Sequence, residues 1–96
     1  MADLKLSDAD IAARLAALPE WKIDGKVISR RFSFSSFPEA IQFTNSVAEI
    51  AEERKHHPFI QIDFKHVTLK LTTWHAGGLT EEDFEEARAF DALYQS

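Results

Sequence analysis

The amino-acid sequence predicts an α+β fold in which a four-stranded antiparallel sheet carries its helices on one face. Three observations support this prediction. Several segments alternate apolar and polar residues with the period of a strand, others repeat apolar residues with helical spacing, and the strands come in adjacent pairs. The expected order is α-β-β-α-β-β-α. Hairpins joined by a helix favour an antiparallel sheet with the helices together on one side.

The first half of the chain contains a helix and a hairpin. Ser7 is typical of a helix cap, and the apolar spacing that follows it continues until Pro19. Residues 21–23 form a short predicted strand and 27–34 the strand that returns beside it. Asp24-Gly25 between them favours a tight turn, because glycine accepts a positive φ.

A long amphipathic helix, a second hairpin and a last helix follow. Ser36 caps a predicted helix over 38–55, whose apolar stripe is made by Ala40, Phe43, Val47 and Ile50. Residues 60–64 and 67–73 alternate as strands, with a tight turn expected at Lys65-His66. Gly77-Gly78 breaks the pattern, and Thr80 to Asp83 resembles the capping box of a helix that continues to Tyr94. The acidic residues Glu81, Glu82, Glu85 and Glu86 are expected to form a solvated face of that helix.

Length and charge exclude several classes of protein. The 96 residues are expected to form one domain, 1–96. The formal charge of −5 argues against direct nucleic-acid binding, since phosphate binding favours a basic face. There is no cysteine, no apolar run long enough to span a membrane, and no signal-peptide profile in residues 1–5. We therefore expect a cytoplasmic protein.

The most informative stretch lies where the long helix ends, at His56-His57-Pro58. Histidine is the side chain whose unperturbed pKa, about 6.5, allows proton transfer near neutral pH. The proline forces the chain out of the helix, so both rings are held at an element boundary, where side chains can face a cleft.

The spacing around these histidines resembles a known family. The chain matches the motif of the pterin-4a-carbinolamine dehydratases. The match begins with Glu52-x3-His56-His57-Pro58 and continues with Phe64 after five further residues, Trp74 after nine more and Asp83 after eight more. Leu18-Pro19-x-Trp21 and Gly77-Gly78-Leu79-Thr80 extend the resemblance over nearly the whole chain.

The resemblance implies a 4a-hydroxytetrahydrobiopterin dehydratase, a hydro-lyase that recycles a pterin after an aromatic amino-acid hydroxylase has acted. Such enzymes remove the C4a hydroxyl as water and yield the quinonoid dihydropterin, without a metal or an organic cofactor. Positioned imidazoles can take a proton from N5 and supply one to the hydroxyl, each contributing roughly 10²–10⁴-fold. The family also implies a homodimer or homotetramer, built by joining sheets edge to edge and by packing helices.

The resemblance also implies residue roles. His57 is the expected principal acid/base, and His56 orients the substrate and shares proton transfer. Glu52 lies one helical turn before His56 and is expected to favour the charged imidazole. The direction of both rings is set by Pro58. Trp21 is expected to line the pocket, with a core position as the alternative, and Asp83 to cap the last helix or support the site.

One position departs from the usual pattern, because many members have a third histidine where this chain has Trp74. An indole only donates a hydrogen bond and cannot transfer protons. We expect Trp74 to pack or to form a pocket wall. His75 follows it, but adjacent strand residues point to opposite faces, so His75 could serve the substrate only if the strand has already ended.

Two alternatives to an enzyme remain open. The first is a non-catalytic dimerisation or assembly partner of another protein, a role known among animal and other relatives of the family and favoured by the missing third histidine. The second is a metal site built from Glu52, His56, His57 and His75, although known relatives of the family use no metal.

Overall fold

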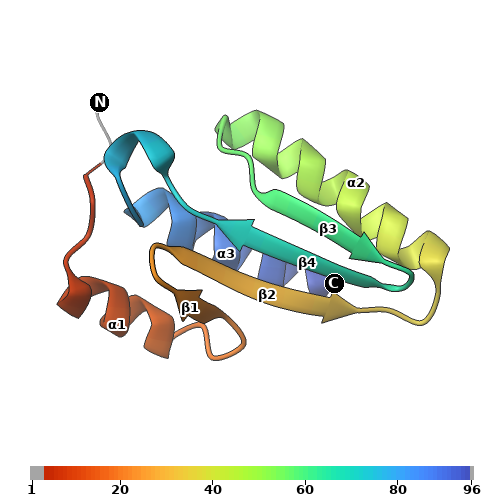
Figure 1. Cartoon of the computed structure of the whole chain (residues 1–96). Helices are drawn as coiled ribbons and strands as arrows, with labels where there is room; N and C mark the ends of the chain where they lie inside the picture. Colours follow the sequence, from red (N-terminus) through yellow and green to blue (C-terminus); the bar gives the residue numbers. More distant parts are fainter. Residues whose placement is uncertain (1–3, 96) are drawn as a thin grey trace.

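A computed structural model describes residues 4–95 of the chain (Figure 1). The helices are α1 (Asp8–Ala16), α2 (Phe37–Arg54) and α3 (Glu81–Tyr94), with a short 3-10 helix, η1 (Trp74–Ala76). The strands are β1 (Lys22–Asp24), β2 (Val27–Ser33), β3 (Phe59–Asp63) and β4 (His66–Leu71). This order confirms the predicted α+β fold. Residues 1–3 and 96 lie outside the described residues. The prediction about a signal peptide in residues 1–5 and the prediction of one domain over 1–96 both include some of them.

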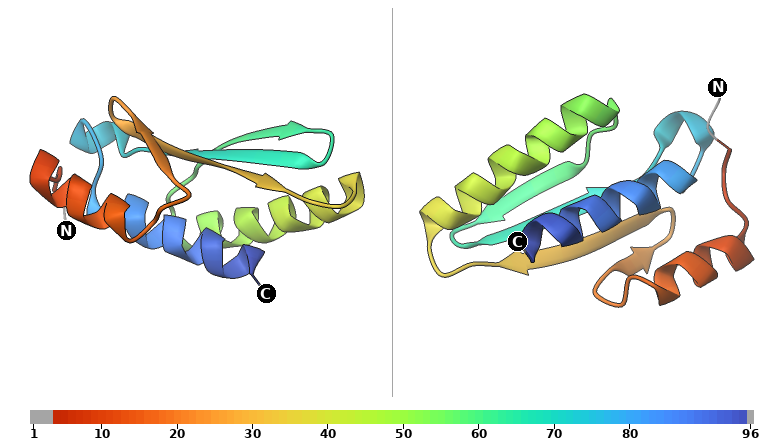
Figure 2. Two further views of the ribbon diagram at one scale, coloured as in Figure 1. Left: turned by 90° about the horizontal axis from the view of Figure 1, so that it is seen from below. Right: turned by 180° about the vertical axis from the view of Figure 1, so that it is seen from behind.

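The four strands form one antiparallel sheet in the order β1-β2-β4-β3, so β1 and β3 are its edges. The three α-helices lie on the same side of this sheet (Figure 2), as the sequence predicted. The opposite side, which we call the open face, is covered by no helix in residues 4–95 (Figure 1). Within these residues no helix is both long enough and apolar enough to cross a membrane.

The core lies between the sheet and the helices. Alternate residues of β2 and β4 are fully or almost fully buried on this side: Ile28, Phe32, Val67, Leu69 and Leu71. Helices α2 and α3 complete the core with Ala40, Phe43, Val47, Phe84, Ala87 and Phe90. Since strand side chains alternate between faces, the intervening residues of the same strands project from the open face.

Helix caps and one turn were predicted correctly, and another turn was not. Ser7 and Ser36 each accept a hydrogen bond from a first-turn backbone N–H, as predicted. Gly25 has a φ of 63°, which explains the glycine in the first hairpin. In the second hairpin, Asp63 pairs with His66, so the turn consists of Phe64 and Lys65 rather than Lys65-His66. His66 therefore begins β4, and its Nδ1 lies 2.9 Å from the Ser33 hydroxyl.

Candidate active site

The two neighbouring histidines are separated by the way in which α2 ends. Lys55 adopts the left-handed conformation, with φ 56° and ψ 38°, and the backbone N–H of His56 then bonds to the carbonyl of Ala51 at 3.1 Å. This is the usual geometry of a helix C-terminus, although glycine is the residue that favours it. The chain leaves the helix at this residue, and His56 and His57 enter different environments.

His56 lies in a closed polar network, with only 11% of its side chain exposed. Its Nδ1 lies 2.8 Å from Glu86 Oε1, and its Nε2 lies 3.0 Å from the hydroxyl of Thr73. The same Nε2 is 3.1 Å from Asp83 Oδ1, as an ion-pair contact. Both ring nitrogens are therefore engaged by groups of the protein itself.

The two carboxylates of this network are completely buried, Asp83 on the first turn of α3 and Glu86 on the next. Asp83 Oδ2 accepts hydrogen bonds from the Thr80 backbone N–H at 2.9 Å and from the Thr73 hydroxyl at 2.8 Å. Among residues 4–95, Asp83 Oδ1 and Glu86 Oε2 receive no hydrogen bond, so the carboxylates depend on the nearby imidazole for compensation.

This arrangement keeps His56 protonated. The ion-pair contact with Asp83, then the hydrogen bond with Glu86, raises the pKa of His56 from 6.5 to about 10, against the opposing effect of burial. A ring that stays charged at neutral pH and has both N–H groups engaged cannot act as a base. The geometry thus favours an orienting role for His56, and its share in proton transfer stays a prediction.

Glu86 and Thr73 were not identified from the sequence, and the expectation that Glu86 is solvated is wrong. A signal was present: Glu86 lies three residues after Asp83 and four before Phe90, on the buried stripe of α3. Asp83 caps α3, as predicted, but its complete burial keeps it away from a ligand on the surface.

His57 is in the opposite situation, with 62% of its side chain exposed. Its Nε2 lies 2.5 Å from Glu52 Oε2, itself 77% exposed. The sequence paired Glu52 with His56, which would require the helix to continue through residue 56. The left-handed turn at Lys55 instead brings the next residue, His57, to that carboxylate. In the described part of the chain, the Nδ1 atom of His57 makes no hydrogen bond.

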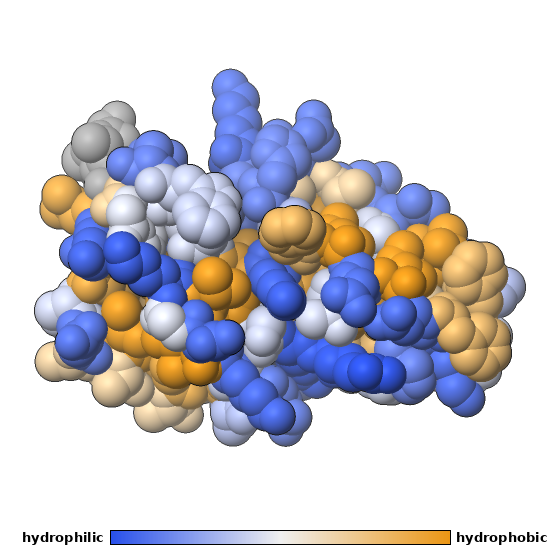
Figure 3. All heavy atoms as spheres, viewed as in Figure 1, coloured by the Kyte–Doolittle hydropathy of each residue, from blue (hydrophilic) through white to orange (hydrophobic). Residues whose placement is uncertain are grey.

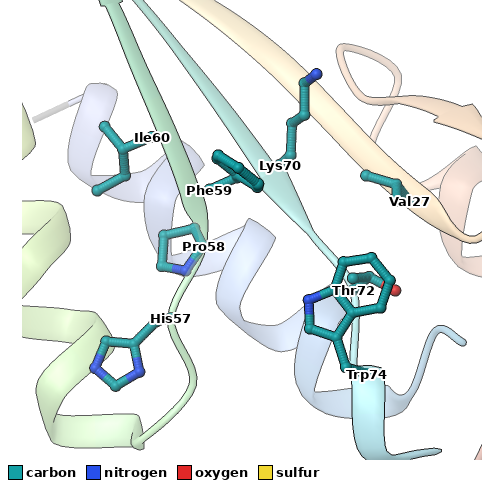
Figure 4. A pocket seen from close by; sticks show the side chains of 8 residues that line it. All are labelled: Val27, His57, Pro58, Phe59, Ile60, Lys70, Thr72 and Trp74. Carbon is teal, nitrogen blue, oxygen red and sulfur yellow. The ribbon is translucent and has the colours of Figure 1, made fainter. Parts of the chain in front are cut away.

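A cavity of about 570 Å³ opens beside His57, on the open face at the end of the sheet where α2 ends (Figure 4). Its lining residues are Val27, His57, Pro58, Phe59, Ile60, Lys70, Thr72 and Trp74. The volume falls within the range of roughly 300–1,000 Å³ typical of small-molecule sites. Figure 4 shows the imidazole of His57 and the indole of Trp74 on opposite sides of the hollow.

Comparison with known proteins identifies the family. Residues 4–93 match the model of the pterin 4 alpha carbinolamine dehydratase family. The chain belongs to this family. A relative from Picosynechococcus sp. whose name places it in the same family is 51% identical over 90 residues, covering 93% of this chain and 97% of the relative. A relative from Chloroflexus aurantiacus with the same family name is 47% identical, at 93% and 96% coverage.

Solved structures agree with this assignment. The structure of a transcriptional coactivator/pterin dehydratase from Brucella melitensis has a TM-score of 0.89 and 33% identity, and the match covers 94% of this chain and 98% of that one. A pterin dehydratase-like protein described as a RuBisCO assembly factor in the alpha-carboxysome has a TM-score of 0.69 and 29% identity, at 80% and 92% coverage. Membership of this family of lyases confirms the predicted class of enzyme.

The tryptophans of this dehydratase-family chain have contrasting positions. Trp74, 78% exposed, lines the cavity, in line with the predicted wall. Trp21 lies in the core instead of the pocket. It is 4% exposed, it packs edge-on against Phe32, and its indole N–H donates to Asp91 at 2.8 Å. A large apolar side chain whose N–H has a hydrogen-bond partner stabilises the fold more when it is buried in the core than when it lies at the rim of a pocket.

The remaining candidates are divided between the cavity and its surroundings. Pro58 lines the cavity. His75 is exposed in η1, after β4 has ended at Leu71, so the condition for its participation is met, yet it does not line the cavity. The metal site considered from the sequence is not assembled, since no group of three or more potential ligands in residues 4–95 is arranged to hold an ion.

Proposed function

We propose that this protein dehydrates 4a-hydroxytetrahydropterins to quinonoid dihydropterins, and so recycles a cofactor of the tetrahydrobiopterin type. The observation that carries the proposal is the cavity on the open face, which combines an exposed imidazole with apolar and aromatic walls. A flat, largely apolar ring system with one reactive polar edge fits such a site. The family of the chain supports the same reaction.

The reaction requires one proton to be removed and one to be supplied. As the C4a–O bond breaks, the lone pair of N5 forms the C4a=N5 double bond, N5 loses its proton, and the hydroxyl leaves as water after gaining one. His57 is the acid/base in this proposal because its ring lines the cavity. Its Nε2 contacts Glu52, and no residue in 4–95 forms a hydrogen bond with its Nδ1, so Nδ1 is available to a ligand. Glu52 contacts the other nitrogen and so fixes the orientation of the ring.

His56 has a structural role in this proposal. Its imidazolium holds Asp83 and Glu86 together and attaches the end of α2 to the beginning of α3. Thr73, hydrogen-bonded to the same ring, immediately precedes the cavity residue Trp74. The network therefore supports both sides of the cavity, and His56 is a positioning residue.

The test is a stopped-flow dehydration assay on 4a-hydroxytetrahydropterin generated by an aromatic amino-acid hydroxylase. Replacing His57 by alanine should lower the rate by about 10²–10⁴-fold, the usual contribution of a positioned acid/base. His66→Ala is the matched control, because this histidine lies in β4 and does not line the cavity. Near wild-type turnover by His57→Ala would remove His57 from its proposed role, and no turnover by the wild-type protein would refute the function.

We also propose that the protein is a homodimer or homotetramer. Strand β3 is an edge of the sheet, and three large apolar side chains in and beside it are exposed: Phe59 (72%), Ile62 (37%) and Phe64 (69%). An uncovered apolar edge strand is a template for pairing with another chain. Light scattering after size exclusion at micromolar concentration should give a multiple of the 10.9 kDa chain mass, and a monomer mass would contradict the proposal.

A second candidate function is that of an assembly or dimerisation partner for another protein. The exposed aromatic side chains Phe59 and Trp74, which line one cavity, favour it, because exposed apolar surface marks interaction sites. One structural neighbour is described as an assembly factor and another as a transcriptional coactivator. A wild-type protein that binds no pterin and dehydrates none would favour this second function over the first.

A further inference from the structure

The cavity beside His57 adjoins further concave surface along the open face of the sheet. A second hollow, of about 230 Å³, is lined by Phe59, Ile60, Gln61, Thr68 and Lys70. Three of these residues, Phe59, Ile60 and Lys70, also line the first cavity. A ligand whose ring lies beside His57 thus has room for a substituent that extends past Lys70.

Lys70 is the one permanently charged residue among the described residues that line these two hollows. No carboxylate lines either of them, and no ion pair of Lys70 occurs in residues 4–95. Figure 4 shows its side chain extending from β4 beside the ring of Phe59, on a different side of the hollow from His57. An unpaired ammonium group next to an apolar wall attracts an anion more strongly than a fully solvated one does.

The pairing of the strands places two more cations nearby. Phe59, Lys70, Ser29 and Lys22 are successive partners in one row across the sheet, and Arg31 is opposite Thr68 in the next row. Lys22, Lys70 and Arg31 form a basic cluster on the open face of a chain whose net charge is −5. Figure 3, viewed from this side, shows strongly hydrophilic side chains across the middle of the sheet.

Among residues 4–95, no acidic side chain lines the two hollows that Lys70 lines, although Asp63 accepts a hydrogen bond at 2.8 Å from Gln61 of the second hollow. Glu20 lines a third hollow together with Lys22 and Arg31, so the charge of those two residues is partly balanced. Asp24 and Asp63 are the last residues of β1 and β3, beside the hairpin turns. Lys70 is therefore the member of the basic cluster that is closest to the His57 cavity and least neutralised.

We propose that Lys70 forms a subsite for an anionic group on the substituent at C6 of the pterin, an inference that rests on the proposed function. Atom C6 is bonded to N5, which loses its proton in the reaction, so a substituent there begins beside the reactive edge and can extend along the sheet. The preferred substrate class is a pterin whose C6 side chain carries a phosphate or a carboxylate.

The test compares the binding of stable oxidised pterins to the full chain, measured by calorimetry at fixed, low ionic strength. The probes are neutral 6-hydroxymethylpterin, its phosphate ester, and pteroylglutamate, which carries carboxylates at the end of a longer substituent. At least one anionic probe should bind about two- to fivefold more tightly than the neutral one, as expected for a partly exposed charge pair. The tighter of the two anionic probes identifies the anion and the length of the side chain.

Lys70→Met should abolish this preference, so that the anionic probes bind no more tightly than 6-hydroxymethylpterin does. Lys65→Met is the matched control, since it removes the same charge from the β3–β4 turn, outside both hollows. Equal affinity of the wild-type protein for all three probes would overturn the inference alone, and so would an equal loss of preference in the two variants. Failure to bind any of the probes would overturn the proposed function together with the inference.

Discussion

The surroundings of His56 and His57 are very different, although the two residues are adjacent in the sequence. His56 is 11% exposed and holds two buried carboxylates, whereas His57 is 62% exposed and pairs with one exposed carboxylate at the edge of a cavity. The first ring is fixed as a cation, and the second is accessible to a ligand. In the proposed mechanism, these adjacent residues of the same type have separate roles: His56 holds the site together and His57 performs its chemistry.

The cause of the difference is a single backbone conformation. Because Lys55 turns into the left-handed region, the helix does not continue, and Glu52 meets His57 instead of His56. His56 is directed toward α3, where Asp83 and Glu86 surround it. Neighbouring histidines in a motif therefore need not act as a pair.

Among the substitutions that test the contrast between the two histidines, His56→Ala is expected to have the largest effect on stability. Removal of the imidazolium leaves Asp83 and Glu86 buried beside an empty space and without their cation. The free energy of unfolding should fall by about 3–5 kcal/mol, measured by urea denaturation followed by circular dichroism. His57→Ala is the control and should change stability by no more than about 0.5 kcal/mol, since the ring is largely exposed. Equal losses in the two variants would contradict the difference in roles.

The pH dependence of stability should sharpen the comparison. The folded state raises the pKa of His56 from 6.5 to about 10, so the folded protein holds a proton that the unfolded chain has released over that range. The stabilisation is complete below pH 6.5 and is lost as the pH rises toward 10, so the free energy of unfolding should fall across this window. In Glu86→Gln, which removes one of the two carboxylates that raise this pKa, the fall should be smaller and should end at lower pH. A parallel profile in the variant would argue that His56 is not the group responsible.

A smaller effect is expected from Trp74→His, which places an imidazole opposite His57 in the cavity. The new ring offers a second acid/base on the other side of the substrate, so the dehydration rate should rise severalfold, or the preference between the two C4a epimers should change. Turnover of both epimers is measured by stopped flow, with Trp74→Phe as a control that keeps an aromatic wall without the proton chemistry. Identical rates for the histidine variant and the wild-type protein would contradict the prediction.

The smallest effect concerns the backbone that separates the two rings. A non-glycine residue in the left-handed region costs roughly 1–2 kcal/mol, so Lys55→Gly should raise the free energy of unfolding by about 1 kcal/mol, after the entropy of glycine in the unfolded chain is included. Dehydration activity should be retained. Lys55→Ala keeps the strain and removes only the charge, and thermal unfolding of both variants separates the two contributions. A destabilised glycine variant would show that the lysine side chain itself holds the turn.

Local patterns in the sequence were sufficient for most of the fold. The order of the elements followed from hydrophobic periodicity, and the caps at Ser7 and Ser36 from short polar side chains before apolar runs. These features depend on residues within a few positions of one another. The turn at Phe64-Lys65 was misplaced by one residue, because neither position has the glycine or asparagine that usually accompanies a positive φ, yet Phe64 has a φ of 52°.

By itself, the sequence determined the family of this protein, the element order, and the two histidines that would matter. Only the tertiary structure decided that His57 reaches the cavity and that His56 lies in one network with the buried Glu86. It also decided that Trp21 belongs to the core and that Lys70 lines the hollow beside His57. The physical reason is that burial and ion pairing depend on contacts between residues far apart in the chain, such as His56 with Glu86, 30 positions apart. One left-handed residue at the end of a helix redirects those contacts without leaving a clear signal in the sequence.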